Sequence, residues 1–293
     1  MSRMNRRQML QAGAATAAAA LASPLAAAQS APAAATSPVV HRHNIHQSVS
    51  RWCYSKIPLE QLCSYSAGIG LEGIDLLQPE EWETPTRYGL RCTMGYANGG
   101  DIKNALNRVE NHAAIETAFR KFIPMAAKLN VPNVITFSGL RAGMSDDEGA
   151  RNCILGLKRV APIAEANGVN ICMELLNSKR DHKDYMCDHT AWGVRVMEEV
   201  NSTHVKLLYD IYHMQIMEGD LIATIKANAQ WLGHFHTGGV PGRHELDSTQ
   251  EIEYAGVMRG ILSTGYKGYV AHEFVPARDP LTSLAEAAIL CDV

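Results

Sequence analysis

Short apolar runs alternate with segments of helical periodicity along most of the chain. Eight runs have the length of a strand, and the segments between most of them place apolar residues three and four positions apart, as amphipathic helices do. The strand-like runs are 44–49, 73–77, 90–94, 133–137, 169–173, 205–209, 231–235 and 269–271. The helical segments are 58–67, 111–130, 145–167, 189–200, 218–229, 251–264 and 281–290. This alternation predicts parallel strands joined by helices.

Polar residues at the ends of two helical segments support their boundaries. Asn111 stands where an N-cap is expected, and Ser145 with Glu148 has the spacing of a capping box. Gly168 directly follows the second of these segments, as a helix C-terminus favours.

Residues 40–293 have the roughly 250-residue length of a (β/α)8 TIM barrel. A doubly wound open sheet also alternates strands and helices, but it usually carries a glycine-rich phosphate loop after its first strand. No such loop follows 44–49. We therefore predict an α/β fold with a single TIM barrel over 40–293 and no second domain.

The first 36 residues differ in composition from the rest of the chain. Arg6 and Arg7 precede an alanine-rich stretch over 12–22, and an Ala-x-Ala pattern stands at 26–28. A basic start, a weakly apolar centre and small residues at the end are typical of an export signal. The arginine pair favours the twin-arginine route. We expect 1–36 to be an export signal with an alanine-rich linker, and the mature protein to be periplasmic.

Charge and hydropathy exclude several partners. The chain has 27 basic and 30 acidic residues, a net charge of −3, and loss of the leader's three arginines would make it −6. An acidic protein is a poor partner for nucleic acid. No apolar run reaches about 18 residues, so we expect no membrane span in the mature chain. The seven cysteines have irregular spacing and no C-x-x-C motif, which favours reduced, buried thiols, with one disulfide left open.

The last four strand-like runs each end on a carboxylate or an imidazole. These residues are Glu174, Asp210, His236 and Glu273. Their separations match one strand–helix unit each, so they should stand on adjacent strands at the end of the barrel where active sites form. Three converging carboxylates repel one another unless a cation lies between them. The set predicts one divalent metal ion, Mg²⁺, Mn²⁺ or Co²⁺, with Zn²⁺ also compatible.

Motifs around these residues resemble the hydroxypyruvate isomerase branch of the xylose-isomerase-like TIM barrels. The resemblance is specific over 170–276 and looser over 40–168. The segments that carry it are Glu174-Leu175-Leu176-Asn177, Asp210-Ile211-Tyr212-His213-Met214-Gln215, Gly233-His234-Phe235-His236, Pro241-Gly242-Arg243-His244-Glu245 and Glu273-Phe274-Val275-Pro276. It implies that Glu174, Asp210, His236 and Glu273 hold the metal. It also implies that His213 and Arg243 bind the substrate.

The chain departs from that branch in two ways. Gln often stands in the branch where this chain has His236, whereas the related ketose 3-epimerases have His. An export signal is also unusual for an isomerase of central cytoplasmic metabolism. Both departures concern the substrate and not the fold.

The chemistry that such a site can perform follows from its groups. A metal chelated by a carbonyl oxygen and the neighbouring hydroxyl oxygen acidifies the carbon-bound proton. Glu174 and Glu273 are then the base and acid candidates, acting through an enediolate. Return of the proton to the neighbouring carbon isomerises the substrate, and return to the opposite face of the same carbon epimerises it. Arg243 offers a planar fork that suits a carboxylate substrate.

Each of the remaining candidates also has a structural interpretation. His213, expected in the loop after Asp210, could bond a loop carbonyl, and Arg243 could pair with Glu245 at the surface. Asn177 could bind substrate or form a turn.

Three further side chains have no clear catalytic role from the sequence. His234 should share the inward face with His236, behind the metal rather than bound to it. His272 should point outward, and Trp52 could either wall the pocket or pack in the core.

The leading hypothesis is a metal-dependent isomerase of a small hydroxy-keto acid, of the hydroxypyruvate and tartronate semialdehyde type. The alternatives are a ketose or keto-sugar epimerase or isomerase of the same superfamily and a non-catalytic periplasmic sugar-binding barrel. An abasic-site endonuclease would need further histidines on the second to fourth strands, and 90–94 and 134–137 contain none. We expect a small-molecule substrate and no nucleic acid, and leave a homo-oligomer open.

Overall fold

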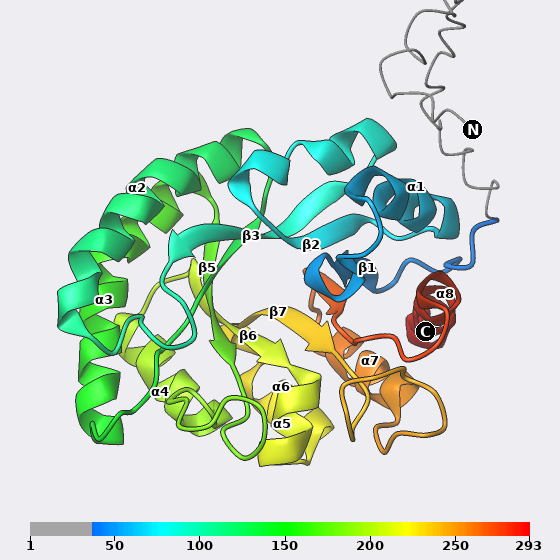
Figure 1. Ribbon diagram of the computed structural model, residues 1–293. Coiled ribbons are helices and arrows are strands. Elements are labelled where there is room, and N and C mark those ends of the chain that lie inside the picture. Colours follow the sequence, from blue (N-terminus) through cyan, green and yellow to red (C-terminus); the bar gives the residue numbers. More distant parts are fainter. Residues whose placement is uncertain (1–36) are drawn as a thin grey trace, which may run out of the picture. The chain divides into compact units, whose positions relative to one another are not determined.

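The computed structural model describes residues 37–293, and the export signal predicted over 1–36 lies outside the described residues. Eight parallel strands close into a barrel in sequence order, with β1 paired to β8 (Figure 1). The strands are β1 (His46–Ser50), β2 (Gly73–Leu77), β3 (Arg91–Gly99), β4 (Asn133–Thr136), β5 (Asn170–Leu175), β6 (Val205–Asp210), β7 (Leu232–Thr237) and β8 (Tyr269–His272). The predicted TIM barrel is confirmed.

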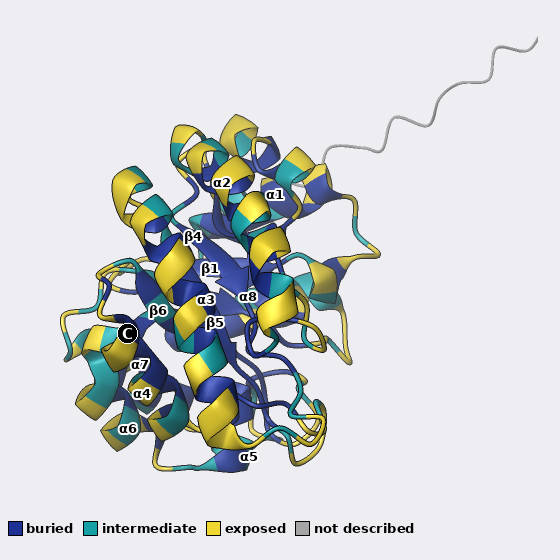
Figure 2. Cartoon of the chain, turned by 90° about the vertical axis from the view of Figure 1, so that its left-hand side faces the viewer, coloured by how far each residue is buried: buried dark blue, intermediate teal, exposed yellow. Residues whose placement is uncertain are grey.

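Helices follow the strands and cover the outside of the barrel. They are α1 (Leu59–Ile69), α2 (His112–Lys128), α3 (Asp146–Asn167), α4 (Thr190–Val200), α5 (Ile211–Met217), α6 (Leu221–Asn228), α7 (Tyr254–Leu262) and α8 (Pro280–Cys291). Their inner faces are buried against the strands and their outer faces are exposed (Figure 2). The apolar core therefore lies largely between strands and helices, which leaves the carboxyl ends of the strands for polar groups. None of the helices described is long and apolar enough to cross a membrane.

The predicted ends of α3 are correct, and Asn111 stands at the predicted N-cap position of α2 but makes no cap bond. Ser145 Oγ accepts the amide hydrogen of Glu148, and Gly168 ends the helix in the left-handed region at φ 65°. Asn111 instead closes a short 3-10 turn and donates from its side chain to the carbonyl of Ala105, so it makes no cap bond.

Two other elements differ from the sequence expectation. β3 continues to Gly99, five residues beyond the predicted end, and its pairing with β2 is irregular around Asp75. The segment predicted as one helix over 218–229 contains only α6, and a separate short helix, α5, begins directly after β6. All seven cysteines are unpaired thiols, and six of them are buried.

Candidate functional site

Four strands deliver three carboxylates and one imidazole to a single point. Glu174 and His236 are the penultimate residues of β5 and β7, Asp210 is the last residue of β6, and Glu273 follows β8. One ligand atom from each lies within 4.8 Å of every other, and all four side chains are buried. The structure thus brings together the four residues that the sequence predicted as metal ligands.

The imidazole of His236 shows that this cluster fits a cation. Its Nδ1 lies 2.5 Å from an oxygen of Glu273, 3.3 Å from Glu174 and 4.0 Å from Asp210. Among the described residues, this buried nitrogen has no hydrogen-bond partner of good geometry. This unpartnered nitrogen and the three carboxylates that it faces together form a set of metal ligands. A divalent ion bound between them would give the nitrogen a partner and balance the negative charge. Mg²⁺, Mn²⁺, Co²⁺ or Zn²⁺ would suit this set of oxygens and one nitrogen.

Arg243 neutralises part of this negative charge. One terminal nitrogen of its guanidinium lies 2.8 Å from Asp210 Oδ2 and 2.6 Å from Glu273 Oε2. The other terminal nitrogen donates to His213 Nε2 at 2.9 Å. The alternative of a surface pair with Glu245 is wrong, because Arg243 is turned inward onto the carboxylates. Its guanidinium also lies over the ring of Trp52, 5.6 Å from the ring centre.

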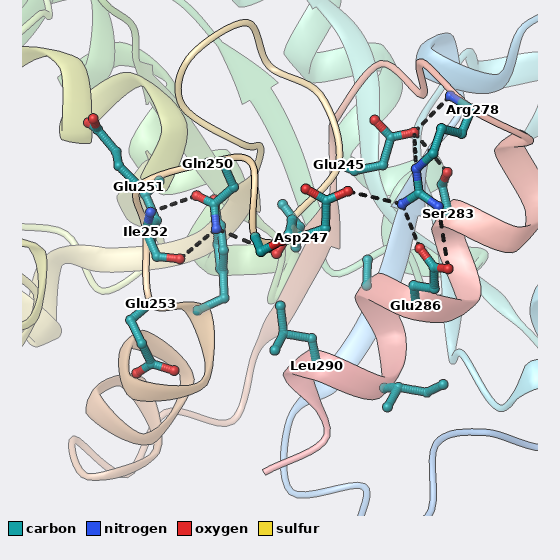
Figure 3. Close-up of a pocket in the computed structure, with 15 residues that line it drawn as sticks. Glu245, Asp247, Gln250, Glu251, Ile252, Glu253, Arg278, Ser283, Glu286 and Leu290 are labelled. Atoms are coloured by element: carbon teal, nitrogen blue, oxygen red, sulfur yellow. Dashed lines mark hydrogen bonds and ion pairs between the residues drawn. The ribbon is translucent and has the colours of Figure 1, made fainter.

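Glu245 instead fixes the loop that carries Arg243. Its buried Oε1 accepts the amide hydrogens of Ala277 and Arg278 and the hydroxyl of Ser283. The loop after β7 is thereby tied to the segment that leads into α8, beside a surface hollow of about 820 Å³ (Figure 3). None of the four clustered residues lines this hollow. Glu245 therefore acts on the site through the position of Arg243.

The sequence predicted His213 in a loop, but the structure places it in the first turn of α5. The helix starts there because Asp210 is its N-cap, with Oδ1 accepting the amide hydrogen of His213 at 3.1 Å. The other ring nitrogen of His213 lies 2.6 Å from the side-chain nitrogen of Asn177. Burial, and then the charge of Arg243, lower the pKa of His213 well below the ordinary value, so the ring is neutral.

Asn177 has the turn role that the sequence left open. Its side-chain oxygen accepts the amide hydrogens of Arg180 and Asp181, and its side chain is fully buried. It touches the ring of His213 from behind. Asn177 therefore holds the loop after β5 and presents no free group to the cluster.

Trp52 walls the site rather than filling the core. It stands in the loop after β1, is 41% exposed, and donates from Nε1 to Glu273 Oε1 at 2.5 Å. Its half-exposed ring therefore stands between Glu273 and solvent. This hydrogen bond engages the Glu273 oxygen that does not face His236.

Sequence reasoning missed Asp75, a fully buried carboxylate in the middle of β2. Its two oxygens lie 3.1 Å from Nε2 of His234 and 2.9 Å from Nε2 of His236. The signal was present, because an acid stands between apolar neighbours in a strand-like run. His234 lies beside His236 on the inward face, as expected, and is not among the four clustered residues.

His272 points away from the barrel interior, toward the helices. Its Nε2 lies 2.9 Å from the side-chain oxygen of Gln47, and the side-chain nitrogen of Gln47 donates to the carbonyl of Ala288 in α8. Burial lowers the pKa of His272 to about 4, so it is a neutral structural residue.

The two glutamates of the cluster have pKa values displaced in opposite directions. Burial, and after it the charge of Glu273, raise the pKa of Glu174. Burial alone would raise the pKa of Glu273 as well, but His236 and Arg243 hold it well below its usual value. A pair of carboxyl groups displaced in this way can divide the acid and base roles of a proton transfer.

The sequence and the fold place this chain in a known family. The family model of the xylose isomerase-like TIM barrel matches residues 86–290, which is more than half of the chain. The chain therefore belongs to the xylose isomerase-like TIM barrel family. Its relatives include named isomerases and epimerases, and the chain is an enzyme of that class.

Two relatives and one solved structure illustrate the match. A 2-oxo-tetronate isomerase of Cupriavidus necator is 34% identical over 199 residues, covering 68% of this chain and 70% of the relative. A putative hydroxypyruvate isomerase of Homo sapiens is 29% identical over 233 residues, covering 74% and 83%. The crystal structure of an AP endonuclease, family 2, from Brucella melitensis superposes with a TM-score of 0.75 at 22% identity, covering 83% and 97%. That likeness concerns the fold alone.

Metal binding should release protons. Burial alone would lower the pKa of His236, but the neighbouring carboxylates, Glu273 first, raise it well above that of an ordinary histidine. A metal must therefore displace the proton at Nδ1, and its affinity should rise with pH by up to about tenfold per unit while His236 is protonated. Calorimetry of Co²⁺ binding in buffers of different ionisation enthalpy should give about one proton released per ion. A heat that is the same in all buffers would contradict this assignment.

Proposed function

We propose that this enzyme is a divalent-metal-dependent isomerase that interconverts a small hydroxy-keto acid and its aldehyde isomer. The substrate is of the hydroxypyruvate and tartronate semialdehyde type. The observation that carries the proposal is the buried group of three carboxylates and His236, with the guanidinium of Arg243 beside it. The relatives named as isomerases of small keto acids support the same substrate class.

The chain's own groups suit a proton transfer through an enediolate. A metal held by Glu174, Asp210, His236 and Glu273 supplies Lewis-acid polarisation of the substrate's oxygens. Glu174 and Glu273 are the two carboxylates of the cluster proposed to take the carbon-bound proton and return it to the neighbouring carbon.

Arg243 is the proposed recognition group for the acid. Among residues 37–293, it is the one arginine or lysine in contact with the clustered carboxylates. A guanidinium can bond a substrate carboxylate more directionally than an ammonium can. The adjacent neutral His213 accepts a hydrogen bond from Arg243 and so helps to orient that fork.

A ketose or keto-sugar epimerase is the second candidate. It is favoured by His236, the ligand type that the related ketose 3-epimerases have at this position. It is also compatible with the present bonds of Arg243, which occupy both terminal nitrogens. A substrate panel of hydroxy-keto acids and neutral ketoses separates the two candidates.

Removal of the metal tests the proposal as a whole. Chelation should abolish turnover of the preferred substrate and lower the melting temperature, because a ligand held only by the folded state stabilises it. Adding back Mn²⁺ or Co²⁺ should restore both. In D₂O, the product should carry deuterium on carbon. Full activity in a preparation with less than about a tenth of an equivalent of any metal would refute the metal requirement.

We also propose that residues 1–36 export the enzyme by the twin-arginine route. A reporter fused behind 1–36 should reach the periplasm, and changing Arg6 and Arg7 together to Lys should block its export. Cell fractionation measures both results. Normal export of the double-lysine variant would exclude the twin-arginine route while leaving general export intact.

A further inference from the structure

Asp75 joins the metal-ligand cluster to the barrel interior. It is the middle residue of β2 and is 0% exposed. Oδ2 lies 2.9 Å from Nε2 of His236, in good hydrogen-bond geometry. The same imidazole presents Nδ1 to Glu174, Asp210 and Glu273. The Nε2 side of His236 therefore faces one carboxylate, and its Nδ1 side faces the three carboxylates of the cluster.

The chemistry of imidazole makes this arrangement directional. A neutral imidazole has one nitrogen that donates and one that accepts. In the neutral ring, after the Nδ1 proton has been lost, the carboxylate of Asp75 accepts the remaining hydrogen on Nε2 of His236, and the lone pair lies on Nδ1. A histidine that ligates a metal through one nitrogen commonly donates to a carboxylate from the other. We propose that Asp75 is a positioning residue that fixes His236 as an Nδ1 ligand of the metal.

Other buried groups hold Asp75 in place. Oδ1 accepts a 2.6 Å hydrogen bond from the hydroxyl of Thr93, whose oxygen lies 3.0 Å from that of Ser48. Oδ1 also lies 3.1 Å from Nε2 of His234. With Oδ1 held by Thr93, Oδ2 is aimed at His236. Asp75 therefore acts on the metal through His236 and does not reach the clustered ligand atoms itself.

The same contacts argue against a second metal at Asp75, His234 and His236, although the three side chains are close enough to hold one. Such an ion would need the Nε2 lone pair of His236, and Nε2 donates to Asp75 in the hydrogen-bonded arrangement. The positioning role predicts one metal equivalent per chain, whereas a second site predicts two. Elemental analysis of the Co²⁺-loaded enzyme distinguishes these outcomes, and two equivalents would overturn the proposal.

The main test measures binding of Co²⁺ to the full chain by calorimetry, with the visible absorption spectrum as a second readout. This inference rests on the proposed metal dependence. Asp75→Asn should weaken Co²⁺ binding by about 10- to 100-fold and change the Co²⁺ spectrum, because the fixed orientation of the ring is lost. Asp188→Asn is the matched control. Asp188 is also a buried acid, but it bonds Arg141 and Ser178 away from the cluster, so its change should leave the affinity within about twofold.

A double-mutant comparison isolates the route through His236. The side-chain amide of Gln has no ring tautomer, so Asp75→Asn should have little further effect on Co²⁺ affinity in a His236→Gln background. An equal loss in both backgrounds would show that Asp75 acts by another route and would overturn the proposal. Unchanged affinity of Asp75→Asn in the otherwise native chain would also overturn it.

Two further measurements keep the test decisive. If Asp75→Asn does not fold, Thr93→Val removes one hydrogen bond from Asp75 and should weaken Co²⁺ binding by about threefold to tenfold. No change in that folded variant would count against the proposal. If the unmodified enzyme is fully active and binds no Co²⁺, the proposed metal dependence itself has failed, a result distinct from a failure of Asp75 alone.

Discussion

Replacing Glu273 by Gln should reduce turnover by about 10²- to 10⁴-fold, the loss typical when a positioned acid–base group is removed. Gln is nearly isosteric, and its oxygen can still accept the hydrogen bond from Trp52. It cannot take up a proton, so the enediolate should not form. The measurement is the steady-state rate with the preferred substrate, together with deuterium incorporation from D₂O. Glu174→Gln should behave similarly if both carboxylates move protons.

The controls separate lost chemistry from lost structure. Glu286→Gln changes a half-exposed glutamate that pairs with Arg278 at the surface, and it should leave turnover unchanged. The melting temperature of Glu273→Gln should fall only slightly relative to the loss of rate. Near-normal turnover of Glu273→Gln would exclude the proton route proposed above.

Removing the side chain of Arg243 should produce the second large effect. Arg243→Ala deletes charge-assisted bonds to Asp210, Glu273 and, in the proposal, the substrate carboxylate. We expect kcat/KM for a keto acid to fall by about 10²-fold, mostly through KM, because each such bond is worth about 1.5–3 kcal/mol. A smaller fall in kcat should accompany it, since Glu273 loses a contact. Arg243→Lys keeps the charge but loses the fork, and should recover only part of the activity.

The response of a neutral ketose decides between the two proposed substrate classes. A ketose offers no carboxylate to Arg243, so its KM should barely change in Arg243→Ala. If keto acids and ketoses lose kcat/KM equally, Arg243 serves only to hold Asp210 and Glu273, and the keto-acid proposal loses its recognition group. The comparison requires metal-saturated enzyme, because loss of the guanidinium leaves buried carboxylates without a counter-charge.

The sequence predicted best what depends on strand ends. Glu174, Asp210, His236 and Glu273 were found because a polar residue closing a buried run is visible in one dimension, and parallel strands bring such ends together. Asp75 was missed because it lies within a strand and its partners are far away in sequence. Its importance depends on a contact across the barrel, to His236, which no local pattern encodes.

The prediction of a loop at His213 is wrong because the N-cap, rather than an apolar periodicity, determines where α5 begins. A helix of only seven residues, such as α5, is too short to show an apolar periodicity, so the sequence predicts a loop after β6. The N-cap bond from Asp210 starts that helix, and it uses one oxygen of a residue that was considered only as a metal ligand. The sequence also leaves open whether Arg243 pairs with Glu245 or contacts the clustered carboxylates. The answer depends on how the loop after β7 is anchored.

Closure of the barrel by the pairing of β1 with β8 sets the order in which the site can be completed during synthesis. A ribosome-bound chain that has emerged as far as β7 already carries Glu174, Asp210 and His236, but its first strand still lacks one neighbour. Glu273 directly follows β8, the strand that closes the barrel. The four clustered residues therefore coexist only after β8 has been synthesised. A chain that stops between β7 and β8 carries three of the four and leaves both β1 and β7 without their β8 neighbour, so a complete site requires the closed barrel.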